Sequence, residues 1–196
     1  MAVEIRSLQR SEIAEMEEPF DKGQKGSSSM PHKRNPITLE RLSGLARLLR
    51  GYAISSIENV ALWHERDISH SSVERVVIPD TTILLHYMAW AMREILTGLR
   101  INTDRMRANL ELSKGLIYSQ RLMLELMRCG WSRQQAYEKV QELASSAQAR
   151  DIHLKEATLG DPEVTGALEE ALIDSVFDPN YYLRHVHRIL REVGIA

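Results

Sequence analysis

The stretch ITLERLSGLARLLRGYAISSIENV, residues 37–60, decides the fold. Its apolar residues recur at the spacing of a helix and gather on one face: Leu39, Leu42, Leu45, Ala46, Leu49 and Ala53. The pattern predicts one long amphipathic helix over about 37–60, which has to bury that face against other helices.

A second helix is expected over residues 79–98. Pro79 and Asp80 suit the first turn of a helix, and Gly98 suits a C-cap. Residues 83–92 are apolar nearly all round, which predicts burial between other helices. The polar segment WHERDISHSS, residues 63–72, separates the two long helices.

Residues 4–18 are charged and favour a helix, and Pro19 closes the segment. Its apolar residues stand at helical spacings, namely Ile5, Leu8, Ile13 and Met16. The pattern is already under way at Glu4 without a strong cap before it. This beginning suggests a truncated or split product.

The helical pattern of apolar residues is interrupted near residues 101–104, and Thr103 suits the N-cap of a new helix. Shorter helices are expected after it, over about 104–112, 116–128, 133–149, 162–175 and 180–193. Ser132 with Gln135 fits a capping box, while Gly130 and Gly194 fit helix stops. No segment alternates convincingly like a strand. The chain is therefore predicted to be all-α, with the end of a long central helical bundle in residues 1–102 and a small C-terminal helical domain in residues 103–196.

Composition excludes several classes of protein. The 196 residues are 43% hydrophobic and 27% charged, with a formal net charge of -2. That balance argues against a protein that mainly coats nucleic acid or an anionic membrane. The one cysteine, Cys129, cannot form a disulfide within the chain, which fits a cytoplasmic location. The longest apolar stretch, residues 83–90, is far short of the ~20 residues that span a bilayer.

The segment DKGQKGSSSMPHKRNP, residues 21–36, carries the chemistry. Two glycines, three consecutive serines, two prolines and four Lys or Arg residues predict an exposed loop. Cations, backbone N–H groups and the helix that starts after Pro36 together suit an anion. A serine there could act as a base or nucleophile if its alkoxide were stabilised. The composition alone fits a solvated basic linker as well, and such linkers are common.

The string GSSSMPHKRNP, residues 26–36, resembles the signature of the fumarase/aspartase superfamily, approximately GSSxMPxKxNP, at every fixed position. Residues 63–80 and 115–141 resemble segments of adenylosuccinate lyases, and IRSLQRSE and EEPF before the loop also fit. The resemblance covers essentially the whole chain, and the ending ILREVGIA is similar to a natural C-terminus.

This resemblance implies a function in purine nucleotide biosynthesis. Adenylosuccinate lyases release fumarate by β-elimination from adenylosuccinate, which gives AMP, and from the succinyl-carboxamide ribotide SAICAR, which gives AICAR. They are homotetramers that need no cofactor, and three subunits contribute to each active site. No metal is expected, because His64 and His70 alone are weak evidence for a metal site. His185 and His187 are expected at the surface.

The resemblance also implies residue roles. Ser27 matches the catalytic base, and Lys33 can stabilise its alkoxide. Glu40 matches a glutamate near the site, where it could orient a histidine or lysine, although a first-turn glutamate also stabilises its own helix. The positions implied to contact substrate are Ser28, Met30, Lys33, Asn35, Arg41, Arg66, Ser71 and Arg75. Gly23 and Gly26 are hinge candidates for a loop that has to close over substrate.

The family's general acid is a histidine of the N-terminal half, and nothing in these 196 residues matches its segment. We therefore expect little or no lyase activity from the chain alone, and apolar surface on its bundle helices. Two alternatives stay open. One is another lyase of the superfamily, such as argininosuccinate lyase or carboxymuconate cycloisomerase, although residues 63–72 speak against it. The other is a non-enzymatic helical assembly module whose serine loop is idle.

Overall fold

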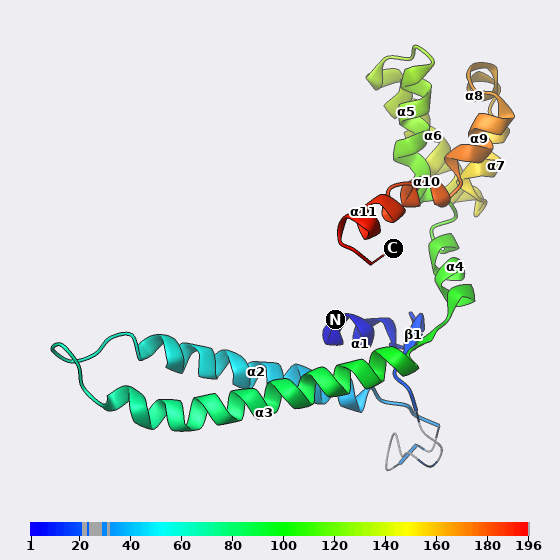
Figure 1. The fold of residues 1–196 in the computed structure, drawn as a ribbon. Coiled ribbons are helices and arrows are strands. Elements are labelled where there is room, and N and C mark those ends of the chain that lie inside the picture. The colour runs from blue at the N-terminus through cyan, green and yellow to red at the C-terminus, as the bar shows by residue number, and fades with distance from the viewer. Residues whose placement is uncertain (21–22, 24–28, 31, 196) are drawn as a thin grey trace. The chain divides into compact units, whose positions relative to one another are not determined.

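The computed structural model describes residues 1–20, 23, 29–30 and 32–195. It divides into two compact units, Met1–Met106 and Arg107–Ala196, whereas the sequence predicted a boundary between residues 102 and 103. The described residues are mostly helical (Figure 1), which confirms the all-α prediction. The exception is a pair of two-residue strands, β1 (Met16–Glu17) antiparallel to β2 (Arg100–Ile101).

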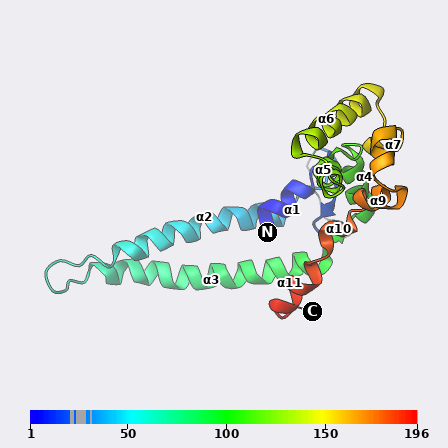
Figure 2. The same cartoon turned by 90° about the horizontal axis from the view of Figure 1, so that it is seen from above.

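Two long helices dominate the first unit. α2 (Ile37–Glu58) and α3 (Ser69–Gly98) lie side by side as a hairpin (Figures 1 and 2). Leu39 and Leu42 of α2 are buried with Ala91 and Ile95 of α3. Ile5 of α1 (Ala2–Leu8) joins the same cluster. The core of this unit therefore lies near the open end of the hairpin, where α2 begins and α3 ends.

The expectation that a helix starts at Pro79 is wrong, because α3 begins at Ser69 and contains Pro79. The N-cap residue, Ile68, makes no side-chain cap bond, but the carboxylate of Asp67 before it accepts the backbone N–H of Ser69 at 2.8 Å and the hydroxyl of Ser69, so one free N–H of the first turn has a partner. Pro79 has no N–H to donate to the preceding turn and its ring crowds the carbonyl four residues earlier, so it weakens α3 at this point without ending the helix. The Thr82 hydroxyl donates to the carbonyls of Ile78 and Pro79 at 3.0 and 2.8 Å.

The predicted burial of residues 83–92 is also wrong for this chain. Ala91 is buried, but Ile83 and Trp90 are 66% and 51% exposed. α3 packs against α2 along one face, and no described residue covers the apolar side chains on its other side. The Tyr52 hydroxyl donates to Asp80 at 2.8 Å and joins the two helices, and this bond raises the pKa of Tyr52.

The single helix expected over residues 4–18 is wrong as well. α1 ends at Leu8, Ala14 has a positive φ of 54°, and residues 16–17 form β1. The backbone N–H of Glu15 donates to the carbonyl of Leu8 at 2.9 Å, so the chain folds back at the end of α1. Helix propensity is a weak preference, and pairing with β2 overrides it here.

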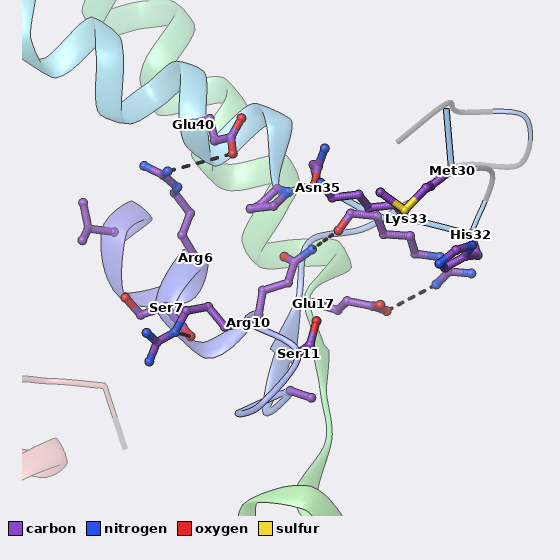
Figure 3. A pocket seen from close by; sticks show the side chains of 15 residues that line it. Arg6, Ser7, Arg10, Ser11, Glu17, Met30, His32, Lys33, Asn35 and Glu40 are labelled. Atoms are coloured by element: carbon purple, nitrogen blue, oxygen red, sulfur yellow. Dashed lines mark hydrogen bonds and ion pairs between the residues drawn. The ribbon is translucent and has the colours of Figure 1, made fainter. Parts of the chain in front are cut away.

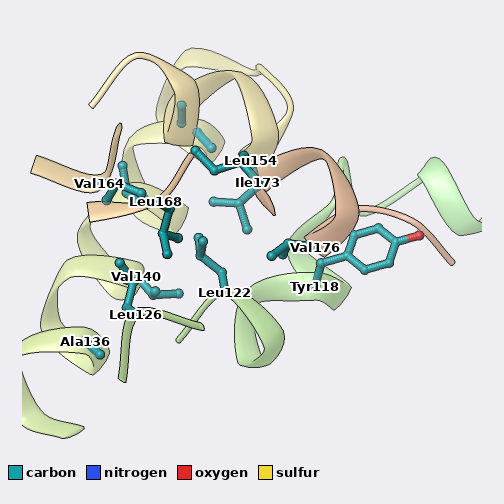
Figure 4. Close-up of a cluster of buried hydrophobic side chains, with 13 residues drawn as sticks. Tyr118, Leu122, Leu126, Ala136, Val140, Leu154, Val164, Leu168, Ile173 and Val176 are labelled. Atoms are coloured by element: carbon teal, nitrogen blue, oxygen red, sulfur yellow. The ribbon is translucent and has the colours of Figure 1, made fainter. Parts of the chain in front are cut away.

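The second unit packs short helices around one core. The chain passes from the first unit to the second within α4 (Thr103–Glu111), and the 3-10 turn η1 (Leu116–Tyr118) and the helices α5 to α11 follow. These are α5 (Ser119–Arg128), α6 (Arg133–Arg150), α7 (Leu154–Leu159), α8 (Pro162–Ala167), α9 (Glu170–Val176), α10 (Asn180–Leu183) and α11 (Val186–Glu192). Leu122, Leu126, Leu154 and Ile173 are fully buried together (Figure 4).

The capping box of α6 is confirmed, because the Ser132 side chain accepts the N–H of Gln135 and the Gln135 side chain accepts the N–H of Ser132. α7 was not foreseen, because its cap is a histidine: the Nδ1 of His153 accepts the N–H of Lys155 at 3.0 Å. The helix expected over 162–175 is two helices, since buried Leu168 takes an extended backbone between them.

Two further details at the ends of helices differ from the sequence prediction. The helix expected over 180–193 is divided into α10 and α11. At the start of α4, the Asn102 side chain, rather than Thr103, accepts the N–H of Arg105 at 3.1 Å. Within the described part of the chain, no helix is long and apolar enough to cross a bilayer.

Candidate active site

A pocket of about 1000 Å³ lies between α1 and the segment that leads into α2 (Figure 3). Four residues implied by the sequence line it: Met30, Lys33, Asn35 and Glu40. The backbone N–H of Lys33 donates to the carbonyl of Met30 at 3.0 Å, and that of Ile37 donates to Asn35 at 2.9 Å. These turns set the chain between the signature segment and the helix.

The expected base, Ser27, and its neighbour Ser28 lie outside the described residues, as does Gly26. Their roles therefore stay predictions. The structure describes residues 29–30 and 32–36 of the signature segment, and Glu40 on the first turn of α2.

Glu40 faces a cation across the pocket. Its carboxylate lies 3.9 Å from the guanidinium of Arg6, and the side chains of Arg6 and Glu40 are 36% and 50% exposed. An ion pair this long and this exposed contributes little to stability. The Glu40 carboxylate is therefore free to exchange Arg6 for a better partner.

Residues that the sequence reasoning did not single out complete the lining. α1 contributes Arg6, the turn after α1 contributes Arg10, and β1 contributes Glu17. The Glu17 carboxylate lies 3.4 Å from Arg34 and 3.7 Å from Arg100. The spacing of Arg6 and Arg10 was the available signal, but it does not reveal that α1 folds against the signature segment.

The lining carries more positive than negative charge. Arg6, Arg10, Lys33 and Arg34 face the carboxylates of Glu17 and Glu40. The guanidinium of Arg34 also lies 5.2 Å from the ring centre of Phe20, a cation–π contact. A concave surface with this balance suits a ligand that carries several negative charges.

The expectation that the start of α2 offers its N–H groups to an anionic ligand is wrong for two of those groups. The buried carboxylate of Glu18 accepts the N–H of Thr38 and the N–H of Leu39, each at 3.1 Å. A carboxylate is favourable there because it also meets the positive end of the helix dipole. The Glu18 carboxylate thus takes the place that an anionic ligand could have at these two N–H groups. A ligand in the pocket therefore has to be bound mainly by side chains.

The remaining implied residues do not line this pocket. Arg41 is an exposed residue of α2, beside Glu40. Arg66 lies between α2 and α3, and Ser71 and Arg75 lie on the first turns of α3, at the opposite end of the hairpin (Figure 1). The 22 residues of α2 span about 33 Å. A ligand in the pocket is therefore out of reach of these three residues of the same chain.

Asp67 organises the turn that carries Arg66. The hydroxyl and the N–H of Ser69, together with the N–H of Trp63, donate to its carboxylate and lower its pKa to about 2. Within the described residues, no three His, Cys, Asp or Glu side chains are grouped so as to hold a metal ion.

Comparisons with known proteins identify relatives of both units. A family model described as the adenylosuccinate lyase C-terminus matches residues 115–193, and one described as lyase matches residues 1–51. The chain is 50% identical to an adenylosuccinate lyase of Thermotoga maritima over 96% of its length, and 51% identical to that of Aquifex aeolicus over 98%. It spans 44% of the length of each of these curated relatives.

Solved structures give the same fold. A 3-carboxy-cis,cis-muconate lactonizing enzyme from Pseudomonas putida superposes with a TM-score of 0.80 at 27% identity, over 94% of this chain and 40% of that one. The much higher identity to adenylosuccinate lyases separates the two groups of relatives. Along almost its whole length, the chain matches the C-terminal portion of adenylosuccinate lyases at about half identity.

Proposed function

We propose that the chain supplies the base-bearing part of an adenylosuccinate lyase active site. The reaction is the β-elimination of fumarate from adenylosuccinate, which gives AMP, and from SAICAR, which gives AICAR. The observation that carries the proposal is the pocket in which Lys33, Asn35 and Glu40 meet, in a chain about half identical to lyases of that name.

The elimination needs a base and an acid. Ser27 takes the proton from the carbon next to a carboxylate, and the electrons of that C–H bond form the new C=C bond. The C–N bond breaks, and an acid protonates the departing nitrogen. Negative charge develops on the carboxylate, where the ammonium of Lys33 and the amide of Asn35 can stabilise it.

Glu40 acts on a proton-carrying partner rather than on substrate. Its pair with Arg6 is long and half exposed, so a histidine from another segment can displace Arg6. His32 is the one histidine among the described residues that line the pocket. Because the family's acid belongs to a segment that these residues do not match, we expect little activity from a polypeptide of these 196 residues alone.

We further propose that the active enzyme is a homotetramer in which copies share their sites. Arg66, Ser71 and Arg75 are implied to contact substrate, yet the length of α2, about 33 Å, separates their end of the hairpin from the pocket of their own chain. A neighbouring copy that runs its hairpin alongside would bring them to it. The exposed apolar side chains of α2 and α3 suit such packing, namely Ile54, Ile57, Ile83, Leu85 and Trp90.

A substrate panel tests the activity. The chain would be mixed with a separately expressed N-terminal half of a related lyase, and fumarate release would be followed with adenylosuccinate, SAICAR and argininosuccinate. We expect release from the two succinylated purine nucleotides and none from argininosuccinate. Cleavage of argininosuccinate would instead support another lyase of the superfamily. If the chain releases fumarate alone, His32→Asn shows whether His32 is the acid.

Sedimentation of the mixture tests the assembly. A homotetramer of completed units is expected, and Ile83→Asp should weaken it because a charge would then lie in the helix interface. The exposed Glu74→Gln is a matched control on α3. A monomeric, fully active mixture would contradict the shared site.

A further inference from the structure

Glu18 is a buried carboxylate that does not line the pocket but contacts the helix that does. Its Oε1 accepts the N–H of Thr38 and its Oε2 accepts the N–H of Leu39, each at 3.1 Å. N–H groups in the first turn of a helix have no partner within the helix. Two bonds from one planar group therefore fix both the position and the rotation of the turn that carries Glu40.

Gln9, the C-cap residue of α1, also binds this region. Its side-chain Oε1 accepts the N–H of Glu18 at 2.9 Å, and its Nε2 donates to the carbonyl of Arg34 at 3.2 Å. A carboxamide can make both bonds at once because it carries an acceptor and a donor. One side chain thus links Glu18, which precedes the signature segment, to Arg34 within it.

The segment that holds Glu18 is itself anchored to the end of α3. β1 pairs with β2, and the N–H of Asn102 donates to the carbonyl of Glu15 at 2.9 Å. Pro19 packs so closely on Gly98 that a Cβ at Gly98 would lie 2.8 Å from the Cβ of Pro19. The segment that contains Glu18 is therefore held at the end of α3, and Glu18 in turn holds the start of α2.

We propose that Gln9 and Glu18 form a clamp of positioning residues, which sets where Lys33, Asn35 and Glu40 stand in the pocket. The proposal rests on the proposed lyase function. Glu18 acts through the first turn of α2, and Gln9 acts through Glu18 and Arg34. Misplacing a catalytic group by about 1 Å can cost about 10²-fold in rate, so a clamp at this point matters for catalysis.

Three substitutions remove defined parts of the clamp. Glu18→Gln keeps one acceptor oxygen and turns an NH₂ group toward a backbone N–H. Gln9→Met keeps the size of the side chain and loses both bonds, whereas Gln9→Glu keeps the bond from Glu18 and loses the bond to Arg34. The exposed Glu4→Gln on α1 is the matched control, because Glu4 neither lines the pocket nor joins the clamp.

The first measurement is amide hydrogen exchange, which needs no lyase activity. We expect Glu18→Gln and Gln9→Met to speed exchange about tenfold or more at Thr38, Leu39 and Glu40. Exchange in α5 of the second unit should stay unchanged and serves as the internal reference. Gln9→Glu should fall between Gln9→Met and the unsubstituted chain, and it remains informative if Glu18→Gln unfolds the first unit.

The second measurement is fumarate release in the mixture with an N-terminal half. Glu18→Gln and Gln9→Met should lower kcat and kcat/KM together by about ten- to a hundredfold, as expected when a transition-state arrangement is disturbed. KM should change less than about threefold, and Glu4→Gln should leave both parameters unchanged.

The outcomes separate the two proposals. If the unsubstituted mixture releases no fumarate, the lyase proposal fails, while the exchange rates still test the clamp. Unchanged exchange at Thr38 to Glu40 in both Glu18→Gln and Gln9→Met would overturn the clamp. Faster exchange there with unchanged kcat and KM would overturn its role in catalysis, since the clamp would then only stabilise α2.

Discussion

The carboxylate of Glu18 accepts the N–H of Leu39 at 3.1 Å, and the two residues are 4% and 0% exposed. This contact decides how the pocket can bind an anion. Because Glu18 already occupies two N–H groups at the start of α2, the negative charges of a substrate have to be met by cations such as Arg6 and Lys33. It also holds the segment after β1 against α2, close to where Pro19 meets Gly98.

Gly98→Ala should destabilise the first unit by about 1–3 kcal/mol, because its Cβ would meet the Cβ of Pro19 at 2.8 Å. Trp90 lies in this unit and Trp131 in the other. Urea unfolding followed by Trp90 fluorescence, with Trp63 and Trp131 replaced by Phe, measures the effect. Gly44→Ala is the matched control: it has open space on α2 and should stabilise by up to about 1 kcal/mol. Equal effects of the two changes would contradict the close contact.

Ser132→Ala should destabilise the second unit by about 1 kcal/mol, because the capping box of α6 loses its acceptor for the N–H of Gln135. Unfolding in urea followed by Trp131 fluorescence gives the value. Ser145→Ala, an exposed change in the interior of α6, should cost nothing. A loss from Ser145→Ala as large as that from Ser132→Ala would show that the cap is not the cause.

Asp67 should titrate near pH 2 in a carboxyl NMR experiment, below its ordinary pKa of 3.8. A lowered pKa in the folded chain means that the charged form stabilises the turn. That stability is present above pH 3.8 and is lost as the pH falls through about 2. Ser69→Ala removes the hydroxyl that contributes most and should raise the pKa. Ser72→Ala, whose hydroxyl donates to the carbonyl of Ser69, should leave it unchanged, and a wild-type value near 3.8 would refute the network.

Glu40→Gln should lower kcat of the complemented enzyme by about 10²–10³-fold, because the amide cannot support a proton-carrying partner as a carboxylate does. Arg6→Met should raise KM, because it removes a cation that meets the substrate, but it should change kcat only a few-fold, since the ion pair of Arg6 with Glu40 is long and exposed. Steady-state fumarate release measures both. A larger loss from Arg6→Met than from Glu40→Gln would mean that the guanidinium, rather than a histidine, is the working partner of Glu40.

The sequence predicted those features that depend on neighbours along the chain. The apolar spacing in residues 37–60 located α2, and Ser132 with Gln135 located the start of α6. The pairing of β1 with β2 was missed, because two-residue strands leave no periodic pattern. Pro79 misled the prediction because proline is typical of a first turn, whereas this helix already begins at Ser69, whose N–H donates to Asp67.

In the site, too, the sequence predicted only what depends on residues close together along the chain. Lys33, Asn35 and Glu40 line one pocket, as residues this close in sequence can do, while their roles stay predictions. Arg6 and the Glu18 cap were missed, because both depend on how α1 and β1 fold back onto α2. Periodicity also identified residues 83–92 as apolar but could not show what covers them.

The most direct test of the central claim compares Ser27→Ala with Ser29→Ala in the chain mixed with an N-terminal half. Fumarate release from adenylosuccinate would be measured for both variants and for the unsubstituted mixture. If the chain supplies the base of an adenylosuccinate lyase, Ser27→Ala abolishes release and Ser29→Ala keeps most of it. Undiminished release by Ser27→Ala, or equal release by the chain without its partner half, would contradict the account.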